Sequence, residues 1–78
     1  MSHEALTLIL GAQNATTALD DCDARWEEWE PAGRGGDVEG FLDRLFGWVW
    51  WEGRLRLQGR RDAVRVVMRL HVLRKLCQ

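Results

Sequence analysis

The chain is poor in cysteine, and that shortage excludes two common ways of stabilising a small protein. Its 78 residues include only two cysteines, Cys22 and Cys77. Two cysteines cannot build a network of disulfides, and they cannot supply a zinc site made of closely spaced cysteine and histidine pairs. A chain of this length forms a single small domain whose own core is modest. Stability must therefore come from apolar packing within residues 1–78 or from a partner, and a homodimer is a candidate assembly.

The sequence also lacks the segments that direct a chain into or across a membrane. It has no run of about 18 apolar residues, the length that a membrane-spanning helix requires. The first residues lack the basic head and the cleavage pattern of a signal peptide. One proline, eight glycines and 46% hydrophobic residues argue against a disordered chain. We therefore predict a folded cytoplasmic protein that does not bind membranes.

Few residues could carry catalysis or bind a metal. His3 lies near a terminus, and His71 lies in an apolar segment that is rich in arginine. Metal binding would require cysteines and histidines to converge from distant positions, without the short ligand pairs of zinc sites. We predict no enzyme activity, no metal and no cofactor. We interpret Cys22 and Cys77 as small buried hydrophobic residues.

The net charge of −1 hides a strong division of charge along the chain. Residues 1–53 contain eleven acidic and three basic residues, whereas residues 54–78 contain eight basic residues and one acidic residue. Two interpretations are open. The acids and bases can match one another between packed helices, or they can form two faces that attract different partners.

Proline and glycine divide the chain into two helical parts. One proline and three glycines exclude continuous helix or strand over residues 30–36, which are predicted to form a loop. Before this loop, small or apolar residues recur every three or four positions, among them Leu8 and Trp29. This spacing predicts one helix over residues 3–29. Gly11 is a weak helix former, and a break near it is the alternative.

A second helix is predicted over residues 37–51. Asp37 suits the N-cap position, and the apolar residues that follow it share one face of a helix. In such a helix Trp51 points away from the apolar face. Gly53 is a natural stop, so residues 52–60 are predicted to form a linker.

The last segment fits a third helix, over residues 61–77. The apolar residues predicted to face the core are Ala63, Val66, Val67, Leu70, Leu73 and Cys77. The region also fits strands, because residues 48–57 resemble a hairpin and apolar residues alternate with basic ones between Val64 and Val72. We predict a small all-α domain of three helices. The alternative is an α+β domain in which the N-terminal helices are followed by a small antiparallel sheet.

Five tryptophans in so short a chain are the most unusual feature of its composition. A single modest core cannot easily hold all of them, so some must be exposed. Tryptophan and arginine are the residues most often found as energetic anchors of protein interfaces. We therefore predict a partner-binding surface or a dimer face that is formed by Trp48, Trp50, Trp51, Arg54 and Arg56.

The basic C-terminal segment supports a second hypothesis. On a helix, the residues that share an arc able to contact phosphates or an acidic partner are Arg61, Arg65, Arg69 and Lys75. The apolar residues between them favour contact with a protein over contact with nucleic acid. A third interpretation pairs these bases with the acids of the first helix.

These features favour binding over catalysis. We predict a non-enzymatic interaction protein that binds a larger protein and modulates or inhibits it, of the kind that phages and mobile elements encode. This prediction rests on the small size of the chain and on its lack of catalytic motifs. The alternative is a small nucleic-acid-binding regulator that uses the basic C-terminal segment.

Overall fold

The computed structural model describes residues 1–78 and contains α-helices but no strand. The helices are α1 (Ser2–Leu10), α2 (Ala12–Trp29), α3 (Val38–Phe46), α4 (Val49–Leu55) and α5 (Arg61–Leu76). A π-helical turn, Glu30–Arg34, follows α2 where a loop was expected. The all-α prediction is confirmed, and the α+β alternative is not supported. Two of the three predicted helices are each divided, so the domain has five helices.

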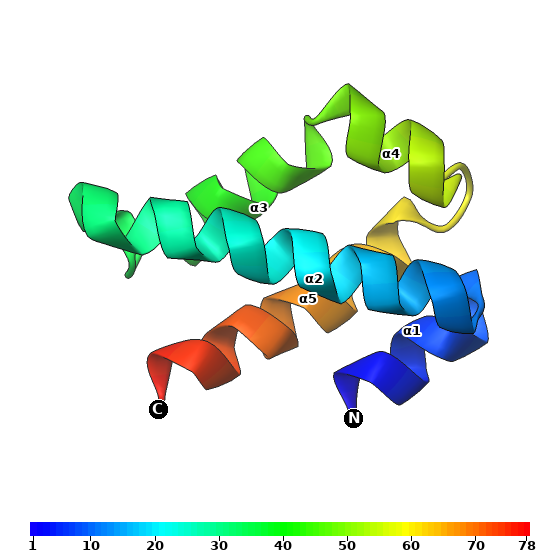
Figure 1. The fold of residues 1–78 in the computed structure, drawn as a ribbon, viewed down its shortest axis with the longest axis horizontal. Coiled ribbons are helices and arrows are strands. Elements are labelled where there is room, and N and C mark those ends of the chain that lie inside the picture. The colour runs from blue at the N-terminus through cyan, green and yellow to red at the C-terminus, as the bar shows by residue number, and fades with distance from the viewer.

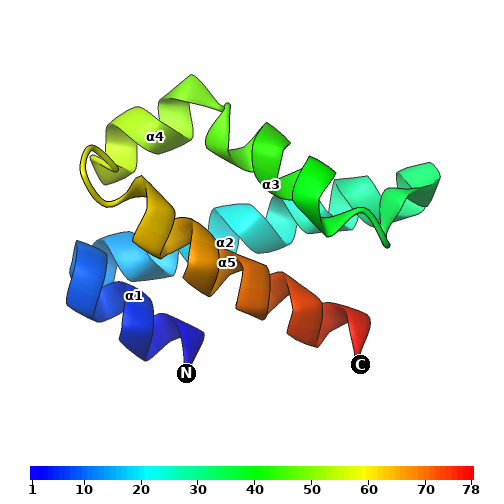
Figure 2. The same cartoon turned by 180° about the vertical axis from the view of Figure 1, so that it is seen from behind.

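The longest helix, α2, runs through the middle of the molecule (Figure 1). In this view α1 and α5 lie along one side of α2, and α3 and α4 lie along the other. α5 contacts both α1 and α3, so it joins the two sides. The view from behind shows both termini at the same edge of the molecule (Figure 2). None of the helices is both long enough and apolar enough to cross a membrane.

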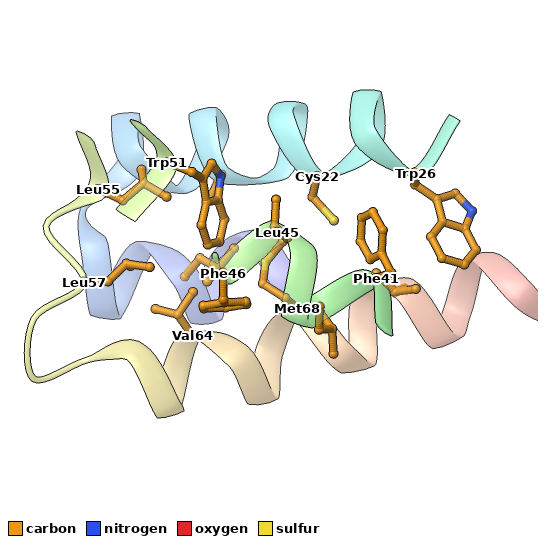
Figure 3. Packing of buried hydrophobic residues seen from close by; sticks show 14 of the residues in the cluster. Cys22, Trp26, Phe41, Leu45, Phe46, Trp51, Leu55, Leu57, Val64 and Met68 are labelled. Carbon is orange, nitrogen blue, oxygen red and sulfur yellow. The ribbon is translucent and has the colours of Figure 1, made fainter. Parts of the chain in front are cut away.

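The core is built around α3, whose apolar face points between α2 and α5 (Figure 3). Phe41, Leu45 and Phe46 of α3 are almost completely buried. The ring of Phe46 packs edge-on against Trp51 of α4, with centroids 4.9 Å apart, and Phe41 packs edge-on against Trp26 of α2 at 5.1 Å. Edge-to-face pairs are a favoured arrangement of aromatic rings. Aromatic contacts on both sides of α3 therefore join it to α2 and α4.

The single helix predicted over residues 3–29 is two helices that meet at Gly11. Gly11 has φ 86° and ψ 160°, a conformation that glycine adopts easily and other residues avoid. The break changes the direction of the chain, so that α1 folds back against α2. As a result Leu6 and Leu10 are buried, whereas Leu8 of the predicted stripe is 90% exposed. The break at Gly11, given above as the alternative, is the one that occurs.

The helix predicted over residues 37–51 is also divided, at Gly47. α3 ends at Phe46, and Trp48 has an extended backbone before α4 begins. The change of direction turns α4 so that Trp51 enters the core and is fully buried. The expectation that Trp51 points away from the apolar face is therefore wrong, because it assumed one continuous helix.

The predicted ends of these helices are partly correct. The Asp37 side chain caps α3, as predicted, by accepting a hydrogen bond of 2.9 Å from the backbone N–H of Gly40. Gly53 does not end α4, which continues into the predicted linker 52–60. Arg56 instead ends the helix in the left-handed conformation, with φ 53°. This is the only residue other than glycine with a positive φ.

α5 covers nearly the predicted range but buries the opposite face. Val64, Met68 and Val72 are completely buried, whereas Val66 and Leu70 of the predicted core face are each 53% exposed. Both faces carry apolar residues at helical spacing, so periodicity alone did not distinguish them. The basic residues beside the buried face reach acids on α3 and α2, and these ion pairs favour the observed orientation.

The two cysteines lie in different environments. Cys22 is buried in the core, as predicted. Cys77 is exposed, contrary to the prediction. It directly follows α5, on the side of the helix that faces solvent and not the core. Burial raises the pKa of the Cys22 thiol to about 12, and nearby Asp23 also raises it. Cys22 is therefore an uncharged thiol at neutral pH.

Shortening one side chain on each face of α5 tests which face of the helix is buried. We expect Met68→Ala to lower the free energy of unfolding by about 2–5 kcal/mol, because it opens a cavity in the core. Leu70→Ala removes a half-exposed side chain and should cost less than about 1 kcal/mol. Urea denaturation followed by circular dichroism measures both values. A larger loss for Leu70→Ala than for Met68→Ala would contradict the orientation of α5.

Candidate functional site

The basic residues of α5 pair with acids on α3. Arg65 Nη2 lies 3.2 Å from Glu39 Oε1 and 2.8 Å from Asp43 Oδ1. Arg69 Nε donates to Glu39 Oε2 at 2.8 Å, and its Nη2 donates to Glu39 Oε1 at 2.9 Å. The Arg69 guanidinium therefore holds the Glu39 carboxylate with two parallel hydrogen bonds, the strongest geometry for such a pair.

The remaining residues of the predicted basic arc also have partners. Lys75 Nζ and His71 Nε2 both contact Asp23 Oδ1, at 2.9 and 2.8 Å. Arg61 forms an ion pair with Glu52. Acids and bases are thus matched within the chain, mainly through α3 and not only through the first helices. Each residue proposed to contact phosphates has a carboxylate neighbour.

These ion pairs change the pKa values of the acids. Hydrogen bonds from Arg69 and then Arg65 lower the pKa of Glu39 to about 2. Partial burial raises the pKa of Asp23, but hydrogen bonds from His71 and Lys75 outweigh that effect, so its pKa is lowered overall. Both carboxylates are therefore charged over most of the pH range in which the protein folds.

One cluster contains residue types that bind metals. Ligand atoms of Cys22, Asp23 and His71 lie within 4.8 Å of one another. Asp23 and His71 are far apart in the chain, so no local sequence pattern predicted this cluster. Two features oppose a metal there: the Cys22 thiol, with a pKa of about 12, strongly retains its proton, and the Lys75 ammonium already contacts the Asp23 carboxylate. The cluster acts most simply as a link between α2 and α5.

The predicted tryptophan surface is centred on the start of α4. The rings of Trp48 and Trp50 lie side by side, with centroids 4.8 Å apart. Arg25 of α2 lies over the Trp48 ring at 3.8 Å, and Arg54 lies near the Trp50 ring at 5.3 Å. Val49, which lies between the two tryptophans in the sequence, is 81% exposed. We call Arg25, Trp48, Val49, Trp50 and Arg54 the α4 surface.

Two members of the predicted surface have other positions. Trp51 is fully buried, so it belongs to the core and offers nothing to a partner. Arg56 is exposed at the end of α4 and lines a wide hollow of about 810 Å³ that also includes Val49 and Leu57. The α4 surface therefore continues into this hollow on one side.

Arg25 belongs to the surface but was missed in the sequence. It is the only basic residue in the acidic run 20–30, and that isolation was the one signal that could have identified it. A nearby acid belongs to the same environment. Burial raises the pKa of Asp21, Asp20 raises it further, and Arg54 and Arg25 each lower it. One buried oxygen of Asp21 has no hydrogen-bond partner.

No protein-family model, curated protein or solved structure matches this chain. The kind of protein must therefore be inferred from its own fold and surface. The fold is a small all-α domain in which most basic residues of the last helix have acidic partners. The most prominent unpartnered feature is the tryptophan pair at the start of α4, in which Trp50 is exposed and Trp48 is partly buried, with an arginine beside each ring.

Acid titration tests the ion pairs of Glu39. Because the folded state lowers the pKa of Glu39, its contribution to stability is present above pH 4.5 and is lost as the pH falls toward about 2. At neutral pH, Glu39→Gln should therefore have a lower free energy of unfolding than the unmodified chain. This difference should disappear as the pH approaches about 2. Urea denaturation at a series of pH values measures this difference.

Glu27→Gln is the matched control, because Glu27 is exposed and has no ion-pair partner. This variant should unfold like the unmodified chain at every pH. A gap between Glu39→Gln and the unmodified chain that stays constant on acidification would contradict the assignment.

Proposed function

We propose that the chain is a non-enzymatic protein-binding domain that contacts a larger protein through the α4 surface and modulates it. The observation that carries this proposal is the Trp48–Trp50 pair, in which Trp50 is exposed, Trp48 is partly buried and an arginine lies beside each ring. Tryptophan and arginine dominate the energetic centres of protein interfaces. Trp50 is 47% exposed and Val49 is 81% exposed, so a partner can bury substantial apolar area there.

The geometry of the α4 surface also favours tight binding. The Trp48 ring contacts both the ring of Trp50 and the guanidinium of Arg25, which belongs to a different helix. Side chains that are already held in place lose less conformational entropy when a partner binds. The two arginines can also form hydrogen bonds at the rim of an interface while their stems cover apolar surface.

The nucleic-acid alternative receives less support. A phosphate backbone would have to compete with Glu39 and Asp43 for Arg65 and Arg69. Lys75 is held by Asp23 in the same way. Neutralised bases release few counterions from nucleic acid and therefore add little affinity.

The hydrogen bonds of the chain also support a binding role over a catalytic one. His3 Nε2 lies 3.0 Å from the Thr16 hydroxyl and His3 Nδ1 lies 3.5 Å from the Thr7 hydroxyl, two contacts that resemble a base with a nucleophile. Each hydroxyl donates its hydrogen bond to a backbone carbonyl, Thr16 to Ala12 at 3.2 Å and Thr7 to His3 at 2.7 Å, so neither donates to the imidazole that would activate it.

A comparison of surface variants tests the proposed function. The immobilised chain should retain a specific protein from an extract of the cells that produce it, and that protein is then purified. We expect Trp50→Ala or Arg54→Ala to weaken its binding by about 2 kcal/mol, roughly 30-fold, as measured by calorimetry. Leu8→Ala is the matched control, because it removes an exposed apolar side chain from α1. Equal binding by all of the variants would contradict the proposal.

A second copy of the chain is the second candidate partner. Residues at heptad-like spacing along the outward face of α5 are Ala63, Val66, Leu70, Leu73 and Cys77. We call them the α5 stripe. Such spacing is typical of helices that pair along a seam, and one stripe used twice forms a closed dimer. The dimer face expected at Trp50 or Trp51 is better supported on α5, because Trp51 is buried.

Light scattering at increasing concentration tests the dimer. The mass should rise from 9.0 kDa toward twice that value, because a second copy covers the α5 stripe. Leu70→Glu should keep the mass at the lower value, since it places a charge on the seam. A mass that stays at 9.0 kDa in the unmodified chain would exclude self-association over the range measured.

A further inference from the structure

A small pocket of about 270 Å³ lies between the end of α2, the π-helical turn and the middle of α3. Its walls include the apolar side chains of Trp29, Phe41 and Leu45. Three arginines, Arg25, Arg34 and Arg44, also line it, together with Glu28. We call this the arginine pocket. The volume is just below the range of about 300–1,000 Å³ that is typical of small-molecule sites, so it suits a single side chain.

The three arginines differ from Arg61, Arg65 and Arg69 of α5 because none of them has an ion-pair partner. Arg61, Arg65 and Arg69 all pair with acids, whereas no carboxylate pairs with Arg25, Arg34 or Arg44. These three are the only basic residues in the acidic part of the chain, residues 1–53. The fold therefore brings every arginine of the acidic part to one pocket. Guanidinium groups that converge in this way are suited to bind a carboxylate or a phosphate.

Trp29 lines the pocket and is more than nine-tenths buried. The Arg34 guanidinium lies 5.3 Å from the Trp29 ring. The indole nitrogen of Trp29 is covered by protein atoms, so a group bound in the pocket meets the guanidinium groups and not the indole N–H.

The arginine pocket is continuous with the α4 surface. Arg25 lines the pocket and also lies over the ring of Trp48. A protein that covers Trp48 and Trp50 therefore passes beside the pocket entrance. Exposed Ala32 and the stems of the lining arginines give the pocket apolar surface for a short hydrocarbon stem.

We infer that the arginine pocket binds the side-chain carboxylate of an acidic residue on the partner protein, next to the apolar contact made by the α4 surface. This inference rests on the proposed function and specifies the chemistry of the partner. The hydrocarbon stem of the acidic residue packs on Ala32 and on the stems of the arginines. Its carboxylate accepts hydrogen bonds from the arginines.

The test uses the full chain and two matched dipeptides. One is N-acetyl-leucyl-glutamyl amide, which carries a single side-chain carboxylate, and the other is the uncharged leucyl-glutaminyl analogue. Each is titrated into ¹⁵N-labelled chain while NMR follows the Trp29 indole N–H and the arginine Nε–H signals. We expect saturable shifts of Trp29, Arg34 and Arg44 with the glutamyl dipeptide and none with the glutaminyl analogue.

Variants show whether the pocket is responsible. The double variant Arg34→Ala/Arg44→Ala should bind the glutamyl dipeptide at least tenfold more weakly. Both side chains are exposed, so the fold should remain intact, which circular dichroism verifies. Arg74→Ala removes an exposed arginine at the end of α5 and should leave the binding unchanged.

Three results would overturn the inference. Equal shifts with both dipeptides would show that the carboxylate is not recognised. Unchanged affinity in the double variant would place the binding elsewhere. Inorganic phosphate that saturates the same signals at lower concentration than the glutamyl dipeptide would make the pocket a phosphate site.

The purified partner separates this inference from the proposed function. A partner that is lost with Trp50→Ala but retained with Arg34→Ala/Arg44→Ala would leave the proposed function in place and overturn the role of the pocket. A partner that binds neither variant supports both the proposed function and the role of the pocket. If neither variant weakens it, the proposed function and this inference fail together.

Discussion

The ion pairs between α5 and α3 favour the orientation of α5 on which the packing of the core depends. Arg69 holds Glu39 with two hydrogen bonds, and Arg65 contacts both Glu39 and Asp43. Individually such pairs at a surface contribute little to stability. Together they favour one of two apolar faces on α5, because only one rotation of the helix brings the arginines to α3. The buried residues Met68 and Val72 then complete the core.

The same pairing determines which charges remain available to a partner. Four bases of α5 pair with acids on α2, α3 and α4, so part of the division of charge along the sequence is neutralised in three dimensions. The unpaired arginines that remain near the tryptophans are Arg25, Arg34, Arg44 and Arg54. Three of these four arginines belong to the acidic part of the chain, so binding chemistry is expected mainly where the sequence showed fewest bases, together with Arg54.

The sequence predicted features that depend on neighbouring residues and missed those that depend on distant ones. Local signals were enough for the all-α class, the Asp37 cap and nearly the full range of α5. The buried face of α5 could not be predicted, because its ion-pair partners lie 26 and 30 residues away in the chain. The pairing of Arg25 with Trp48 had no local signal beyond one base among acids, since it joins α2 to the start of α4.

The break at Gly47 links the core to the candidate binding surface. Had α3 continued as one helix, Trp51 would have pointed away from the apolar face. With the break, α4 turns so that Trp51 packs against Phe46, while Trp48 and Trp50 remain near the surface. Three tryptophans within four residues thus divide between two roles. Burial of Trp51 fixes the position of α4, and that position brings Trp48 within reach of Arg25 on α2. The stability of the core and the geometry of the α4 surface therefore depend on the same turn.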